Sequence, residues 1–69
     1  MTLDAYRRSL GWSVSELARR ANVDYTSAKK ALDGKSISGK VAVALASAIS
    51  EAKSETIHFS QIEGLNVNL

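Results

Sequence analysis

Near the start of the chain, apolar residues recur at the spacing of a helix. The first stripe, at positions i, i+3 and i+7, consists of Leu3, Tyr6 and Leu10. Thr2 precedes the stripe and can cap a helix, while Gly11 stands where a left-handed residue commonly ends one. The pattern therefore predicts a first helix over residues 3–10.

A serine and a glutamate three residues apart mark the start of a second helix. Ser13 and Glu16 fit a capping box, in which the serine caps the helix and the glutamate side chain bonds back to the cap. The expected inner face consists of Val14, Leu17, Ala18 and Ala21. Asn22 follows, and asparagine tolerates the left-handed conformation that ends helices. We expect this helix to end at Asn22.

A third helix follows almost at once. Asp24 is a suitable N-cap, and Gly34 a suitable end. The residues expected to point inward are Val23, Ala28, Ala31 and Leu32. Only residues 22–24 separate the second and third helices, and so short a connection favours two helices that cross at a large angle around a tight turn.

The next segment is a polar loop with one apolar anchor, Ile37, and Ser38 can cap a fourth helix over about residues 39–52. Its core stripe is Val41, Ala42, Leu45, Ala48, Ile49 and Ala52. Val43, Ala44 and Ala46 extend the apolar character almost all round. A helix of that kind is usually central and buried.

Beyond the fourth helix the pattern changes to short alternations. We expect a short extended piece, one helical turn around residues 60–64, and an end that is loose or bound to a partner. Together the patterns predict an all-α fold: a compact bundle of four to five helices with a central helix-turn-helix and room for a short C-terminal strand. Residues 1–53 are the predicted main domain, and residues 54–69 a tail.

Charge is unevenly distributed along the 69 residues, although the net charge is only +2. Residues 1–40 hold eight of the nine lysines and arginines against four acids, while residues 41–69 hold one lysine against three acids. A basic first part favours a polyanionic partner. Solvation of ordinary helices by paired charges is the alternative explanation.

Composition limits the chemistry. There is no cysteine and a single histidine, His58, so neither a disulfide nor a structural metal site is expected. No residue is placed to act as a general base held by a partner side chain, and we expect no enzyme activity and no cofactor. No run approaches the roughly 18 apolar residues of a membrane span, and no secretion signal is recognised. The expected location is cytoplasmic, with no membrane partner.

The second and third helices present a particular frame. Leu17-Ala18, Asn22-Val23 and Ala28 with Ala31 fit a helix-turn-helix in which small residues lie where the helices cross. The outward residues of the third helix are Tyr25, Thr26, Ser27, Lys29 and Lys30. A helix with a polar, cationic N-terminal face fits the major groove of DNA.

Residues 13–49 resemble the lambda-repressor-like, or Cro-type, helix-turn-helix family. The resemblance is carried by S-V-S-E-L-A-R-R-A-N-V-D-Y-T-S-A, the following D-G, and the apolar positions of the fourth helix. Two positions depart from the family: Asn22 stands where glycine is usual, and Ala28 where a branched residue is usual. The piece V-D-Y-T-S-A also resembles the headpiece of LacI-type repressors, which normally carry a large effector domain.

The resemblance implies a dimeric transcriptional repressor that binds an inverted repeat in double-stranded DNA through a recognition helix at about residues 24–33. Base edges would be met by Tyr25, Thr26 and Lys30, and bases or phosphates by Ser27 and Lys29. Phosphates would be met by Ser13, Ser15, Lys35, Ser36, Ser38 and Lys40. No small-molecule effector is evident.

The tail carries more apolar surface than a 69-residue monomer is expected to cover. The predicted dimer interface is Ile57, Phe59, Ile62, Leu65, Val67 and Leu69. A tail folded back on its own core is the alternative. For function, the alternative is an antitoxin-like or adaptor module that keeps the helix-turn-helix frame for protein interaction without binding DNA.

Overall fold

The computed structural model describes residues 1–68, which are mostly helical with a small two-stranded sheet. The elements are, in chain order, α1 (Leu3–Ser9), α2 (Val14–Ala21), α3 (Tyr25–Leu32), β1 (Ser36–Ser38), α4 (Gly39–Lys53), a 3-10 turn η1 (Phe59–Gln61) and β2 (Asn66–Asn68). The four predicted α-helices are therefore confirmed. The strand β1 lies where the sequence predicts a polar loop.

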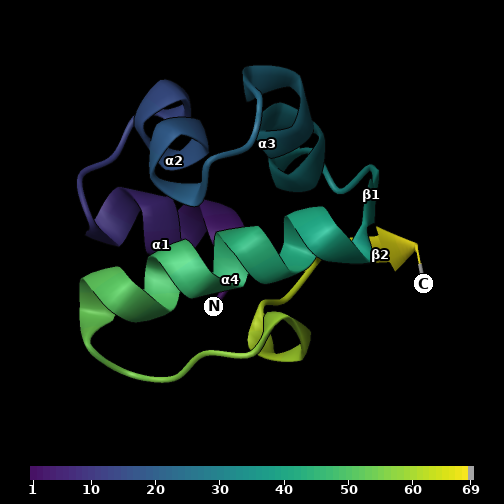
Figure 1. The fold of residues 1–69 in the computed structure, drawn as a ribbon. Coiled ribbons are helices and arrows are strands. Elements are labelled where there is room, and N and C mark those ends of the chain that lie inside the picture. Colours follow the sequence, from purple (N-terminus) through teal and green to yellow (C-terminus); the bar gives the residue numbers. More distant parts are fainter. Residues whose placement is uncertain (69) are drawn as a thin grey trace.

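The long helix α4 lies at the centre of the molecule. Figure 1 shows α2 and α3 side by side above α1 and α4, with the segment that contains η1 on the opposite side of α4. The side chains of Leu17, Leu45 and Ile49 are the largest that are fully buried. Two of these three belong to α4, as expected for a helix that is apolar nearly all round. Every helix within residues 1–68 is too short or too polar to cross a lipid bilayer.

Each α-helix begins at a polar side chain that accepts a hydrogen bond from the backbone N–H three residues later. The four caps are Thr2, Ser13, Asp24 and Ser38, all at predicted positions. The capping box predicted at Ser13 is only half formed, because the Glu16 carboxylate is bound by Arg19 and Arg20 instead.

A reciprocal capping box occurs instead at the start of η1. The His58 ring accepts a hydrogen bond from the backbone N–H of Ser60, and the His58 N–H donates to Gln61 Oε1 at 2.7 Å. The helical turn predicted around residues 60–64 therefore lies slightly earlier, at Phe59–Gln61. The sequence signal is weak because histidine is an uncommon cap.

The turn between α2 and α3 has the predicted conformation. Asn22 is left-handed, with φ of 57°, and Asp24 already caps α3, so three residues connect the two helices. Gly34 has φ of 75° after α3, as predicted for a residue that ends a helix. The backbone between Ser13 and Gly34 therefore follows the sequence signals closely.

The end of the chain folds back on the molecule. Strand β2 pairs in parallel with β1, with Ile37 opposite Val67. Parallel neighbours need a crossover connection, which α4 and the following turn provide. Glu63 also donates a backbone hydrogen bond to the Met1 carbonyl at 3.0 Å. The end of the chain was expected to be loose or bound to a partner, and it is not loose at Glu63 or at residues 66–68, whose backbone is paired within the chain.

The tail also supplies part of the core. Ile57 and Ile62 are 7% and 3% exposed, and they belong to the same apolar cluster as the helices. Phe59, Leu65 and Val67 are half-buried against it, and Leu69 lies outside the described residues. The expectation that the apolar tail residues stay exposed in a single chain is therefore wrong for Ile57 and Ile62. These two side chains are buried because they pack on the apolar side of α4 that faces away from α2 and α3.

Candidate nucleic-acid interface

The outer face of α3 protrudes from the molecule. Its inner residues Ala28 and Ala31 are 0% and 3% exposed. The side chains of Tyr25, Thr26, Lys29 and Lys30 are exposed, and Ser27 is half-buried. Tyr25 in particular is 51% exposed, although it is one of the few aromatic residues of the chain. The structure therefore brings the predicted polar residues of this helix together on one accessible face.

Small side chains hold α3 close to its neighbours. Ala18 on α2 and Ala28 on α3 are both buried, and α2 and α3 are in extensive contact. The alanine at position 28 leaves little side chain between the helices. The outer face of α3 is thus supported from behind by a tightly packed pair.

The front of α3 is fixed by its cap. The Asp24 carboxylate accepts a hydrogen bond from the Ser27 N–H at 3.2 Å. Hydrogen bonds from Ser27 are the main cause of a lowered Asp24 pKa, and the charge of Lys30 contributes in the same direction. Asp24 is consequently ionised at neutral pH, and it complements the positive end of the helix.

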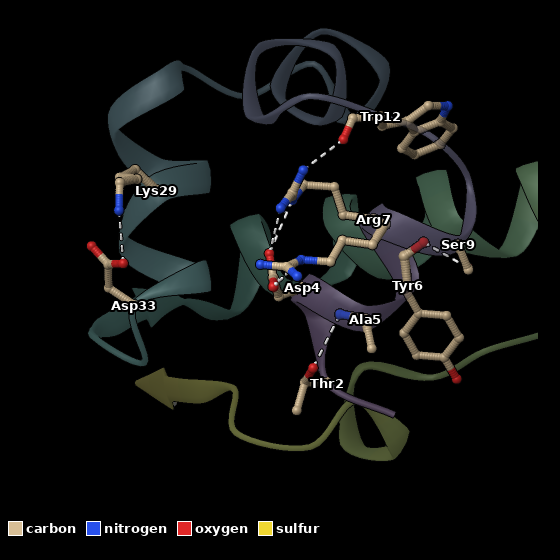
Figure 2. A network of polar contacts seen from close by, with 10 residues as sticks. Thr2, Asp4, Ala5, Tyr6, Arg7, Ser9, Trp12, Lys29 and Asp33 are labelled. Atoms are coloured by element: carbon tan, nitrogen blue, oxygen red, sulfur yellow. Dashed lines mark hydrogen bonds and ion pairs between the residues drawn. The ribbon is translucent and has the colours of Figure 1, made fainter.

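The two neighbouring lysines differ in their surroundings. The Nζ of Lys29 lies 2.8 Å from Oδ1 of Asp33, one turn further along the helix, as Figure 2 shows. The hydrogen bond to Asp33 raises the pKa of Lys29. Lys30 forms no ion pair within residues 1–68. Of the two, Lys30 is the one whose charge is not balanced by a bonded carboxylate.

The segment after α3 is anchored at both ends. The backbone N–H of Lys35 donates to the Lys30 carbonyl at 2.9 Å, and the buried Ile37 holds β1 against the core. Lys35, Ser36, Ser38 and Lys40 are exposed. The Ser38 hydroxyl accepts from the Val41 N–H at 3.2 Å and so caps α4. These four predicted residues therefore follow directly on from the face of α3.

Ser13 and Ser15, predicted to contact phosphate, are both exposed at the start of α2. Ser13 Oγ accepts a hydrogen bond from the backbone N–H of Glu16, with an N–O distance of 3.1 Å, and Ser13 therefore caps α2. Ser15 lies in the first turn of α2. The hydroxyl of each can still donate a hydrogen bond to a phosphate oxygen.

The sequence patterns did not predict that arginines of α1 and α2 bind acidic side chains of the same helices. Glu16 Oε2 accepts from Arg20 Nε at 2.6 Å and from Arg19 as well. These hydrogen bonds, that from Arg19 first, lower the pKa of Glu16 to about 2. The guanidinium of Arg20 also lies 5.2 Å from the centre of the Trp12 ring. The spacing of one acid and two arginines within a helical turn was the signal in the sequence.

Arg7 joins α1 to the connection that follows it. Its guanidinium donates to Asp4 Oδ1 and, at 2.7 Å, to the carbonyl oxygen of Trp12, as Figure 2 shows. Arg8 binds the second oxygen of Asp4 at 2.8 Å. The hydrogen bonds that Asp4 accepts from Arg7 are the main cause of the lowered pKa of Asp4. Arg7 thus stabilises the loop before α2.

No group of three or more His, Cys, Asp or Glu side chains suited to a metal ion occurs within residues 1–68. His58 is exposed and caps η1, on the opposite side of α4 from α3. Comparisons with protein-family models, with curated proteins and with solved structures give no match to this chain.

Proposed function

We propose that this protein is a sequence-specific DNA-binding transcriptional regulator that inserts α3 into the major groove. The observation that carries the proposal is the two-sided character of α3: buried alanines behind and an exposed row of Tyr25, Thr26, Lys29 and Lys30 in front. An α-helix with its side chains is about 10–12 Å in diameter, which suits a groove about 12 Å wide.

The side chains of this face have the chemistry that base edges require. Lys30, which forms no ion pair among the described residues, is a donor suited to guanine O6 and N7, and the Thr26 methyl suits the thymine methyl group. Lys35, Ser36, Ser38 and Lys40 follow α3 and suit phosphates, as do Ser13 and Ser15 at the start of α2. Phosphate contacts orient a protein on the duplex, while base contacts select the sequence.

We propose that the protein binds as a two-fold dimer on an inverted repeat and acts as a repressor. Two recognition helices would then lie about 34 Å apart, one turn of DNA. Among the residues predicted for the dimer interface, Phe59, Leu65 and Val67 keep part of their surface accessible and are the ones available to a second copy.

The test is selection of bound duplexes from a random DNA library, followed by footprinting on the enriched sequence. The expected result is a two-fold symmetric site that is protected and bound at least about 1,000 times more tightly than scrambled DNA. No enrichment, together with no retardation at micromolar protein in low salt, would rule out the regulator.

One observation favours a protein-interaction module as the second candidate. Most basic side chains of the first helices are already bound to carboxylates of the same chain, which reduces the charge offered to DNA. Under this alternative the face of α3 binds another protein. It predicts that the library selection fails while substitution of Tyr25 still abolishes capture of a partner.

A further inference from the structure

The basic side chains of this chain fall into two groups. Five of the nine lysines and arginines form ion pairs with three carboxylates. Asp4 binds Arg7 and Arg8, Glu16 binds Arg19 and Arg20, and Asp33 binds Lys29. Each of these five cations is therefore paired with a carboxylate of the protein, although Asp4 and Glu16 each bring one negative charge to two arginines.

The remaining four are lysines that form no ion pair within the described part of the chain. Lys53 lies apart, with its Nζ 5.7 Å from the centre of the Tyr6 ring at the C-terminal end of α4. That end is about 20 Å from Lys40, given the rise of a helix. Lys30, Lys35 and Lys40 are themselves exposed and lie within residues 30–40, between which Ala31 and Ile37 are buried. We call these three lysines the lysine strip.

Pairing changes what a cation contributes to DNA binding. Exposed ion pairs are individually weak, so a phosphate can displace the carboxylate. The displaced carboxylate nevertheless stays beside the phosphates and repels them, and its negative charge cancels one positive charge of its group. A paired cation therefore releases fewer counterions on binding than a free lysine does.

The position of Asp33 supports a role beyond stability. An acid at the C-terminal end of a helix opposes the helix dipole, and Asp33 is the C-cap of α3. Its side chain instead binds Lys29, on the helix proposed to enter the groove. Asp33 thus offsets a positive charge on α3, although its own negative charge at this end of the helix is unfavourable for the stability of α3.

We infer that the cations which this protein presents to DNA are confined to the lysine strip, and that Asp33 and Glu16 confine them by binding Lys29, Arg19 and Arg20. This inference depends on the proposed DNA binding and deepens it. It names which basic residues contact DNA and which acids keep the others from doing so.

The test is the salt dependence of binding to a labelled duplex of scrambled sequence, measured by fluorescence anisotropy between 50 and 300 mM KCl. Three free cations predict a slope of log K against log[salt] of about −2.7 per bound protomer, whereas all eight cations of residues 1–40 would give about −7. Lys35→Ala and Lys40→Ala should each make the slope shallower by about 0.9, while Arg19→Ala and Lys29→Ala should leave it unchanged.

The reverse substitutions release the paired cations. Asp33→Asn should make the slope steeper by about 0.9, and Glu16→Gln should steepen it further because it frees two arginines. Glu55→Gln is the matched control, since it makes the same change in net charge at an exposed position without an ion pair in residues 1–68. It should leave the slope unchanged, and circular dichroism melting confirms that each variant is folded.

The outcomes separate this inference from the proposed function. A wild-type protein that binds no duplex at any salt concentration overturns both. The confinement alone is overturned if the wild-type protein binds but Arg19→Ala makes the salt slope shallower, or if Asp33→Asn does not make it steeper. Equal steepening by Asp33→Asn and Glu55→Gln would overturn it too, because net charge and not its placement would then govern binding.

Discussion

The hydroxyl of Ser50, on α4, accepts a hydrogen bond from the backbone N–H of Ile57 at 2.8 Å. Its own proton faces the carbonyl oxygens of Ala46, at 2.7 Å, and Ile57, at 3.0 Å. One half-buried serine thus satisfies the backbone of the tail where it turns back along the helix. The polar partner is needed because an unpaired buried N–H is costly.

We predict that Ser50→Ala lowers the free energy of unfolding by about 1–3 kcal/mol, because the Ile57 N–H loses its acceptor. Urea denaturation measures the change. Ser47→Ala is the control: Ser47 is exposed on the same helix, and its substitution should change stability by less than about 0.5 kcal/mol. Equal effects of the two substitutions would contradict the assigned role.

Ile62 tests whether the tail belongs to the core of one chain. Ile62→Ala should lower the free energy of unfolding by about 2–5 kcal/mol, because the side chain is 3% exposed. Val43→Ala, at a position 51% exposed, should cost much less. The destabilisation should be independent of protein concentration. A loss that vanishes at high concentration, with a shift from dimer to monomer in sedimentation, would instead place Ile62 at a subunit interface.

Asn22 tests the turn between α2 and α3. Its φ of 57° lies in the left-handed region, which glycine adopts without strain and β-branched residues resist. Asn22→Gly should leave the melting temperature close to that of the wild type, whereas Asn22→Val should lower the free energy of unfolding by roughly 1–2 kcal/mol. Comparable stability of the two variants would show that the turn relaxes to another conformation.

Glu16 predicts a pH dependence of stability. Its pKa falls from 4.5 to about 2 on folding, because Arg19 and Arg20 bind the carboxylate. A lowered pKa in the folded state means that the stabilisation is present above about pH 4.5 and is lost as the pH falls toward 2. Because the pair is exposed, added salt should weaken the effect.

The measurement is the urea midpoint from pH 6 to pH 2 for the wild type and Glu16→Gln. The difference between them should shrink as the pH falls, and this comparison isolates Glu16 from Asp4 and Asp24, whose pKa values are also lowered. Glu55→Gln should run parallel to the wild type. Parallel curves for Glu16→Gln as well would show that the arginine contacts do not persist in solution.

Lys30 tests the proposed base contact. Lys30→Ala should weaken binding to the selected DNA site by about 1–3 kcal/mol and relax the preference at one base pair. Competition binding against single-base variants of the site measures both effects. An equal loss on scrambled DNA would assign Lys30 to the phosphate backbone alone.

Local signals in the sequence predicted the helices well, because each helix carries its own start and end. Thr2, Ser13, Asp24 and Ser38 are caps whose hydrogen bonds reach only three residues. The exposed face of α3 followed from the same spacing, since Ala28 and Ala31 fix which side is buried.

What the sequence did not predict depends on distant contacts. The pairing of β1 with β2 joins residues with no local relationship, and three-residue strands have no usable period. The burial of Ile57 and Ile62 depended on whether α4 needed cover on its second side. The binding of five basic residues by three acids depends on side-chain rotamers, which helical spacing permits without requiring.

The parallel pairing of residue 36 with residue 66, and of Thr2 with Glu63, has a consequence for how the chain acquires its structure. Helices α1 to α4 make mostly local contacts and can form early, but the sheet closes only when segments far apart in the chain meet. The sheet can therefore close only after residues 66–68 have been synthesised.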